Sequence, residues 1–219
     1  MEFQFSVLAN NYPALLRGGL VTLLITAIAL GIGLAIGAAL CAGRLLRGSA
    51  LDRLALTYIS FFRTTPEMVL IFWSYFCIPL IFHIRVSGLL VGSIVLGLVA
   101  AAYFAEIFRA GIEGVPRGQT EAARALGLRG FPQWRFVLLP QALRLMIPPL
   151  VNYFTELIKN TTLLAGIGVA ELSLEAYLLG GQTYRYVELL SAIAFVYFAV
   201  IFPISLWSRL LEAKFRAAT

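Results

Sequence analysis

The chain has 219 residues, of which 60% are hydrophobic and 13% are charged, and its formal net charge is +6. An ordinary soluble domain carries about 25% charged residues, so this chain has too few to coat a water-exposed surface of its size. The composition therefore excludes a soluble enzyme, a disordered chain and a disulfide-rich secreted module. Cys41 and Cys77 both lie in apolar stretches, which predicts neither a structural disulfide nor a cysteine zinc site.

Apolar stretches long enough to cross a membrane recur along the chain. A helix needs about 20 mostly apolar residues to cross the hydrocarbon core of a bilayer. The expected spans are residues 18–43, 58–82, 86–105, 145–170 and 189–208. The second contains Arg63 and Glu67, and the fourth contains Glu156 and Lys159. The sequence thus predicts an all-α integral membrane protein with five spans, in which residues 1–219 form a single transmembrane domain.

The basic residues predict the orientation of these spans, because cytoplasmic loops carry the excess of Lys and Arg. With the N-terminus outside, the cytoplasmic basic residues are Arg44, Arg47, Arg53, Arg63, Arg109, Arg117, Arg124, Arg129, Arg135, Arg144, Arg209, Lys214 and Arg216. Only Arg17, Arg85 and Arg185 then lie outside, and Lys159 lies within the membrane. The positive charge therefore indicates topology, with a cytoplasmic C-terminus, and no nucleic-acid partner.

Small residues recur at helical spacing in two of the spans. Ala29, Gly33, Gly37 and Cys41 are four residues apart in the first span, and glycines at 88 and 92 repeat the pattern in the third. Such stripes let helix backbones approach closely. We expect them to pack helices together, within this chain or between subunits.

Residues 106–144 form the longest segment outside the membrane, and their pattern is that of a compact helical loop. Thr120 is the expected N-cap of a short helix over residues 121–126, and Gly127 suits the position after its end. A second short helix should begin near residue 130 and stop near Pro140. Helices this short are not stable alone and need a partner surface, on the chain's own membrane domain or on another protein. At the start of this segment, Glu106 and Arg109 have the spacing of a helical ion pair.

This segment resembles the EAA loop of binding-protein-dependent ABC importer permeases. The matching residues are Glu121-Ala122-Ala123, Gly127, Val137 and Leu139-Pro140. The flanking runs 102–112, 116–119 and 141–163 are similar to the polar amino acid branch, the histidine/glutamine/arginine-type permeases. The resemblance covers about residues 12–216 and implies a type I importer fold.

The resemblance also implies partners and roles. The short helix would be a coupling helix, with Glu121, Ala122, Ala123, Leu126 and Gly127 docking on a separate ATPase subunit. The chain has no phosphate-binding loop, so ATP and Mg belong to that partner and this chain is neither an enzyme nor a cofactor protein. The family implies two ATPase subunits, a second permease that is identical or paralogous, and an extracytoplasmic substrate-binding protein. It also implies residence in a bacterial inner membrane.

Charged residues inside spans are the second candidate site, because a charge there costs about 2.5–3.5 kcal/mol on insertion scales. Glu156 and Lys159 can pair, and with Asn152 and Asn160 they form a polar stripe that we expect to face the bundle interior. Two interpretations stand side by side. The stripe lines the translocation pathway or a gate near the subunit interface, or the ion pair holds the fourth span against its neighbours.

Glu67 is the other intramembrane carboxylate. The run Arg63-Thr64-Thr65-Pro66-Glu67 is similar to the family's Arg-Gly-Thr-Pro element, but Thr64 replaces the usual Gly and Glu67 stands where an apolar residue is common. Subunits of some basic amino acid and opine importers resemble this chain in having an acidic residue there. The carboxylate could meet a substrate ammonium or guanidinium group, or it could pair with Arg63.

The function expected from the sequence is transport of polar, including basic, L-amino acids by alternating access, driven by ATP on the partner chain. One alternative is a permease of the same superfamily for an opine, a compatible solute or a related amine. Another, of a different class, is a membrane scaffold or sensor that does not transport.

Overall fold

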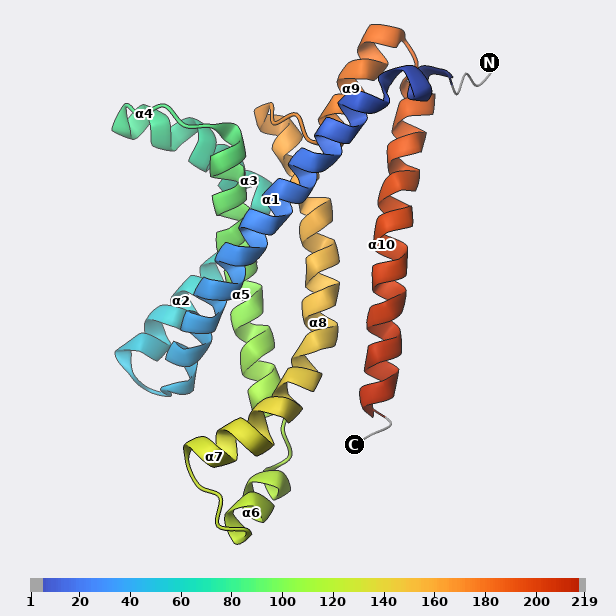
Figure 1. The fold of residues 1–219 in the computed structure, drawn as a ribbon. Coiled ribbons are helices and arrows are strands. Elements are labelled where there is room, and N and C mark those ends of the chain that lie inside the picture. The colour runs from blue at the N-terminus through green and yellow to red at the C-terminus, as the bar shows by residue number, and fades with distance from the viewer. Residues whose placement is uncertain (1–5, 217–219) are drawn as a thin grey trace.

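The computed structural model describes residues 6–216, and every regular element within that range is helical (Figure 1). The elements are α1 (Ser6–Leu45), α2 (Ala50–Thr64), α3 (Glu67–Phe72), the π-helical turn η1 (Trp73–Cys77), α4 (Ile78–Phe82), α5 (Gly88–Glu113), α6 (Arg117–Ala125), α7 (Phe131–Gln133), the π-helical turn η2 (Trp134–Leu138), α8 (Leu139–Asn160), the 3-10 helix η3 (Thr161–Ile167), α9 (Leu172–Thr183) and α10 (Tyr186–Arg216). Figure 1 shows α6 and α7 at the end of the molecule opposite to α9.

The lengths and apolar character of these helices allow three to five membrane spans. Among the described residues, α1, α5 and α10 are each long and apolar enough to cross a membrane. Two bent pairs satisfy the same criteria together: α2 with the segment 67–82, and the segment 131–167 with α9. Five spans result if each bent pair crosses once, so the five-span arrangement stays a prediction.

The helices α1 and α5 form the central contact of the bundle, and small residues bring them together. Ala29, Gly33, Gly37 and Cys41 are all buried in the structure. A methyl group added at Gly37 would lie 2.8 Å from Cβ of Phe104, which is closer than two non-bonded carbon atoms can approach. The expected small-residue stripe therefore packs helices within this chain, and the backbone distance it permits depends on glycine.

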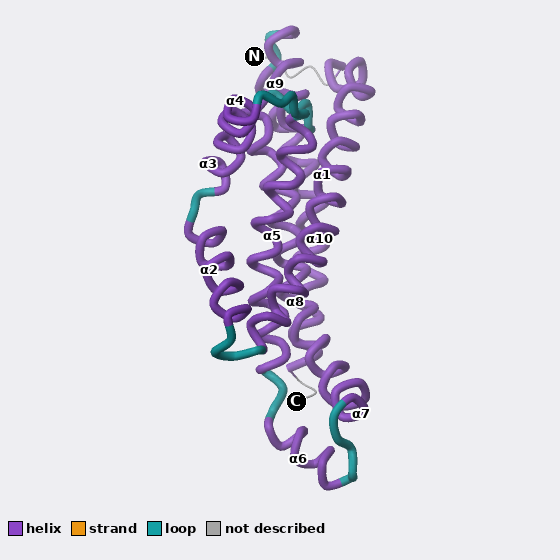
Figure 2. Tube along the Cα trace, turned by 90° about the vertical axis from the view of Figure 1, so that its left-hand side faces the viewer, coloured by secondary structure: helices purple, strands orange, loops and turns teal. Residues whose placement is uncertain are grey.

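The second expected span is two helices with a sharp bend between them. The helix α2 ends at Thr64, and the segment from Glu67 to Phe82 is turned by 102° relative to it. Figure 2 shows the loop that separates α2 from α3. Thr65 has an extended backbone (φ −85°, ψ 131°). This is the conformation that a following proline, Pro66, imposes on its neighbour.

The loop helix that was expected to stop near Pro140 continues instead. From Phe131 the chain passes through η2 directly into α8, which ends at Asn160. Pro140 lies in the first turn of α8, directly after the π-helical turn η2. The expected fourth span, 145–170, thus comprises the end of α8, the 3-10 helix η3 and a turn at Gly168, whose φ is 77°.

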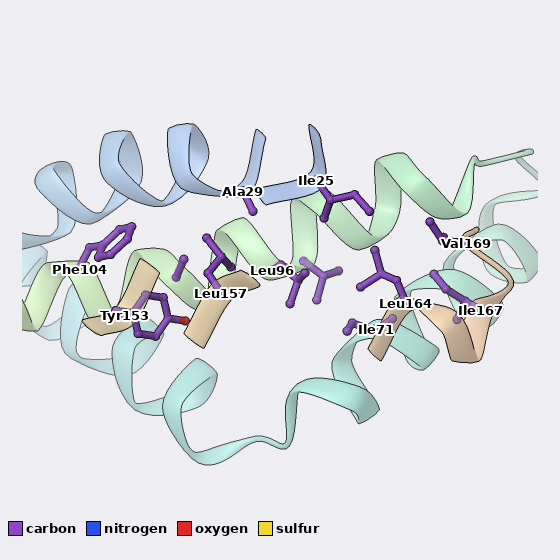
Figure 3. Packing of buried hydrophobic residues seen from close by; sticks show 12 residues of the cluster. Ile25, Ala29, Ile71, Leu96, Phe104, Tyr153, Leu157, Leu164, Ile167 and Val169 are labelled. Carbon is purple, nitrogen blue, oxygen red and sulfur yellow. The ribbon is translucent and has the colours of Figure 1, made fainter. Parts of the chain in front are cut away.

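The main apolar core lies where α1, α5 and α8 cross. Figure 3 shows Ile25 and Ala29 of α1 facing Leu96 of α5, with Leu157 of α8 beside them. These four side chains are at most 1% exposed. The core occupies one side of α8 and therefore leaves its opposite side to carry polar residues.

Candidate functional site

The helix α6 is the centre of the loop that resembles the EAA segment. It begins at Arg117, and its N-cap is Pro116, four residues earlier than the expected N-cap Thr120, so that prediction was wrong. No side chain of the N-cap residue bonds to the first turn, so α6 begins without the side-chain cap that Thr120 was expected to supply. At the other end, Gly127 has a φ of 80°, as predicted for the residue after the helix.

A double hydrogen bond closes the C-terminal end of α6. The Gly127 N–H donates to the Arg124 carbonyl at 3.0 Å, and the Leu128 N–H donates to the Ala123 carbonyl at 2.9 Å. This pair of bonds is the Schellman motif, which requires a left-handed residue between the helix and the following chain. The motif fixes the direction in which the chain leaves α6.

The five residues expected to contact an ATPase differ in exposure. Glu121, Ala122, Leu126 and Gly127 are exposed, and the Leu126 side chain is 80% exposed. Ala123 is only 3% exposed, in a helix that packs against η2 and α7. An apolar side chain as exposed as Leu126 is free to enter a groove on another protein, whereas Ala123 holds α6 in place.

Two glutamines hold α6 against the start of α8. The buried Gln133 side chain donates from Nε2 to the Thr120 carbonyl at 3.1 Å. The Gln141 side chain donates from Nε2 to Oε1 of Gln119 at 3.2 Å. These contacts tie α6 to the chain that continues into α8, so a force on α6 reaches α8 through short, defined links. Nothing in the sequence spacing singled out either bond, because each joins segments more than ten residues apart.

A chain of ion pairs joins the end of α5 to the end of α1 just before α6. Arg109 binds Glu106 and Glu113, each at 2.6 Å, which confirms the expected pairing of Glu106 with Arg109. Glu113 in turn binds Arg47 at 2.6 Å, and Arg44 lies 3.9 Å from Glu106. These contacts connect the base of the loop to α1.

The polar stripe of α8 lies on the open side of the chain. Asn152, Glu156 and Lys159 are exposed and Asn160 is half-buried, whereas Leu157 is buried in the core. Glu156 and Lys159 form the expected ion pair. The apolar side of α8 packs into the core of this chain, so the expectation that the stripe faces a bundle interior formed with another subunit stays a prediction. The stripe is left available to another subunit or to a pathway.

Glu67 lies at the start of α3, at the bend between the two helices. Its carboxylate is within electrostatic reach of Glu156 on α8. The described ion pairs do not join Glu67 to Arg63. The Arg63 guanidinium instead lies over the ring of Tyr103, 5.3 Å from its centre. The alternative in which Arg63 neutralises Glu67 is therefore not seen among the described residues, and Glu67 stays available to another cation.

Two hollows continue from this region along α5. One, of about 440 Å³, and a second, of about 390 Å³, share Arg63, Tyr103 and Glu106 in their linings. The ring of Tyr103 stacks on Tyr153 of α8, with 4.7 Å between ring centres. Charged and aromatic side chains thus line both hollows, and Tyr103 joins them to α8.

A buried carboxylate outside these sites was missed by the sequence analysis. Glu171 is fully buried and accepts hydrogen bonds from the Leu174 N–H at 2.8 Å and from the Tyr197 hydroxyl at 3.2 Å. It caps the start of α9 and ties that helix to α10. The signal for it was its position three residues after Gly168 and directly before an apolar helix, which is where a capping carboxylate belongs.

Comparison with known proteins agrees with this architecture. The chain matches the family model described as "Binding-protein-dependent transport system inner membrane component" over residues 27–217. The probable amino-acid ABC transporter permease protein PatM of Vibrio harveyi is 35% identical over 223 residues, which cover 100% of this chain and 99% of PatM. The glutamine transport system permease protein GlnP of Escherichia coli (strain K12) is 34% identical over 217 residues, which cover 99% of both chains.

Solved structures share the fold as well. The structure titled "Crystal structure of an amino acid ABC transporter with histidines" matches with a TM-score of 0.88 and 31% identity, over 98% of this chain and 100% of that one. An inward-facing form of the MetNI methionine ABC transporter matches with a TM-score of 0.70 at 22% identity, a likeness of fold alone. The fold and the loop define a type I ABC importer permease. The chain belongs to the family of inner membrane components of binding-protein-dependent transport systems.

Proposed function

We propose that this chain is the transmembrane subunit of an ATP-driven importer for polar amino acids, including basic ones. The observation that carries the proposal is the stripe on α8, where Asn152, Glu156 and Lys159 are exposed on a helix whose other side forms the apolar core. Polar side chains facing hydrocarbon are costly, so this side belongs against a partner subunit or a hydrated pathway. The names of PatM and GlnP as amino-acid and glutamine permeases support the cargo class.

The acidic residues favour a cationic group on the cargo. Glu67 lies within electrostatic reach of Glu156, and only Glu156 has an ion-pair partner among the described residues. Glu67, Glu156 and Lys159 together carry a net charge of −1, because Lys159 neutralises one of the two carboxylates. The remaining negative charge is suited to the ammonium or guanidinium group of a basic amino acid. The main chain of any amino acid presents an ammonium group as well, so neutral polar amino acids fit with fewer contacts.

Coupling to ATP hydrolysis is assigned to α6. In this proposal Glu121, Ala122, Leu126 and Gly127 contact a groove on a separate ATPase subunit, which supplies ATP and Mg, while this chain performs no covalent chemistry. Closure of two ATPase subunits on ATP binding would move α6 and, through Gln133 and Gln141, the start of α8. The pathway would then alternate between an inward-facing and an outward-facing form.

The remaining partners follow from the same proposal. A second permease, identical or paralogous, covers the open side of α8, and an extracytoplasmic substrate-binding protein delivers the amino acid. The complex resides in a bacterial inner membrane, with this chain crossing it five times. Charged residues of the open side would then line the boundary between the two permeases.

Uptake into vesicles tests this function. The permease, its ATPase and its binding protein are reconstituted into vesicles, and ATP is supplied on the side of the membrane that carries the ATPase. Accumulation of radiolabelled arginine, histidine, glutamine and glutamate is then followed on that side. We expect ATP-dependent accumulation of at least one of the first three and weaker accumulation of glutamate. Uptake of none of the four amino acids, by a complex that hydrolyses ATP in response to its binding protein, would reject the proposed cargo class.

A further inference from the structure

A hollow lies at the end of the polar stripe nearest the start of α8, and the proposed function does not use it. This inner hollow has a volume of about 360 Å³ and lies between α8 and the C-terminal end of α10. A volume of this size is in the range that holds small molecules. The lining includes Arg144, Leu145, Pro148, Pro149 and Asn152 of α8 and Glu212 of α10.

The α8 wall of the inner hollow continues the polar stripe. Leu145 and Pro149 precede Asn152 by seven and three residues, which is the spacing of one helix face. Asn152 belongs both to the stripe and to the lining of the hollow. Glu156 follows Asn152 on the same face, about 6 Å farther along the helix. A cargo that moves from Glu156 toward α6 therefore reaches the inner hollow next.

Two backbone carbonyl groups in this wall lack their usual helical partners. In a regular α-helix, each N–H donates to the carbonyl four residues earlier. Pro148 and Pro149 lie inside α8 and have no N–H, so the carbonyls of Arg144 and Leu145 lose these bonds. Both residues line the inner hollow. Carbonyl oxygens without a helical donor are suited to accept hydrogen bonds from an ammonium group.

The inner hollow also presents both signs of charge. Arg144 is exposed, and the ion pairs among the described residues include none with it. Glu212 contributes a carboxylate from α10. The carboxylate and the carbonyl oxygens disfavour a ligand that is only anionic, and the guanidinium group disfavours one that is only cationic. A zwitterion, with a carboxylate and an ammonium group, matches both.

A buried hydrogen bond joins the two walls at the edge of the hollow. The Ser208 hydroxyl of α10 donates to the Pro148 carbonyl at 3.1 Å, and Ser208 is buried. Glu212 follows Ser208 by four residues, so it lies one turn farther along the same face of α10. The bond thus holds the face of α10 that carries Glu212 against α8, and the hollow is preformed between two joined helices.

We propose that the inner hollow binds the main chain of a free α-amino acid and is the last site that the cargo occupies before its release. This inference rests on the transport function proposed above. Arg144 binds the α-carboxylate, while the carbonyls of Arg144 and Leu145, together with Glu212, bind the α-ammonium group. All amino acids share these two groups, so the site accepts cargo with different side chains and rejects an amine without a carboxylate.

Binding of arginine and of agmatine tests the site, because agmatine is arginine without its carboxylate. The permease is purified with its partner permease and ATPase but without the binding protein, and equilibrium dialysis measures each radiolabelled compound. Glu67 and Glu156 can contact the guanidinium group of either compound, so the difference between the two reports on the carboxylate contact. The variants are Arg144→Gln, the charge-keeping Arg144→Lys, and the control Arg135→Gln, at an exposed arginine outside the lining.

We expect the unmodified complex and Arg135→Gln to bind arginine about tenfold more tightly than agmatine. Arg144→Gln should lose this preference by weakening the binding of arginine alone, and Arg144→Lys should keep part of it. An unchanged preference in Arg144→Gln would overturn the role of Arg144, and an equal loss in Arg135→Gln would overturn its location. Tighter binding of inorganic phosphate than of arginine would overturn the amino acid as the ligand.

ATP-driven uptake of arginine by the same complex separates this inference from the proposed function. Uptake by an unmodified complex that binds arginine and agmatine equally would overturn the inner hollow as an amino acid site and leave the transport function standing. A clear preference for arginine without any uptake would overturn the transport function, and with it the release step assigned to the hollow. Uptake together with the preference, lost in Arg144→Gln, is the result that the inference predicts.

Discussion

The carboxylates of Glu67 and Glu156 have different surroundings, and this difference separates the roles that we propose for them. Glu156 forms an ion pair with Lys159, three residues later on the same helix. Glu67 has no ion pair among the described residues, because the nearby Arg63 lies over Tyr103. A carboxylate without a cation is the better candidate to contact a cationic cargo. The bend after Thr64 is what brings Glu67 to the open side.

The substitution Glu67→Gln therefore tests the cargo contact at the residue scale. It keeps the size of the side chain and removes its charge, so we expect uptake of a basic amino acid to fall by about tenfold, which corresponds to roughly 1.4 kcal/mol for a lost charge-assisted bond. Glu67→Asp, which keeps the charge, should lose less. Initial uptake rates and membrane abundance are measured together, and unchanged uptake with Gln at this position would eliminate the role.

Gly127 has a backbone role that a side chain would oppose. Its φ of 80° lies in the left-handed region, which costs a residue with a Cβ atom about 1–2 kcal/mol. We expect Gly127→Ala to weaken the end of α6 and to reduce uptake moderately, and Gly127→Arg to abolish uptake with the chain still inserted. Gly118→Ala, in the same helix at an open position, is the control. Full uptake with Arg at position 127 would show that the end of α6 has no part in coupling.

At the scale of elements, the sequence predicted the helix α6 and its end but not its start or its anchoring. The left-handed backbone at Gly127 is a local property, and a glycine directly after a helical pattern predicts it. The start at Arg117 depends on Pro116, and the anchoring depends on Gln133, whose partner lies in another segment. Likewise, Pro66 indicated a break, but the 102° turn of the chain is set by the packing of α3 beside α5 and η3.

The bond from Gln133 to α6 should transmit motion. We expect Gln133→Leu to remove about 1 kcal/mol of anchoring and to leave the Thr120 carbonyl without its partner. Uptake should fall several-fold while ATP hydrolysis continues. Gln182→Leu, at an exposed position on α9 at the opposite end of the molecule, should leave both unchanged. A parallel loss of hydrolysis and uptake in Gln133→Leu would point to misfolding of the loop and contradict a role in transmission.

The contact between α1 and α5 makes a prediction about assembly. Gly37→Leu places a side chain against Phe104 and the α5 backbone, and overpacking of this kind costs roughly 1–3 kcal/mol or more. We expect less folded chain in the membrane and a lower unfolding temperature by fluorescence-detected size exclusion. Gly31→Leu, on the exposed side of α1, should behave as the unmodified chain. Equal thermal stability of the two variants would contradict tight packing at Gly37.

At the scale of the whole molecule, composition and periodicity predicted the all-α membrane fold, and the loop motif predicted the family, which the match over residues 27–217 confirms. The side of α8 that faces outward could not be predicted, since an amphipathic stripe has the same spacing whether it meets its own bundle or a neighbour. The structure shows the outward position of Glu156 and Lys159, because it places Leu157, on the other side of the same helix, in the core.

The central claim is that this chain moves amino acids and is driven through α6. Leu126, the most exposed apolar residue of that segment, gives the most direct test. ATP-driven uptake is measured in vesicles containing the complex with Leu126→Asp, and with Leu46→Asp as a control at an exposed leucine outside α6. The account predicts that uptake is lost with Leu126→Asp and retained with Leu46→Asp, at equal insertion of both chains. Normal uptake with Leu126→Asp would contradict it.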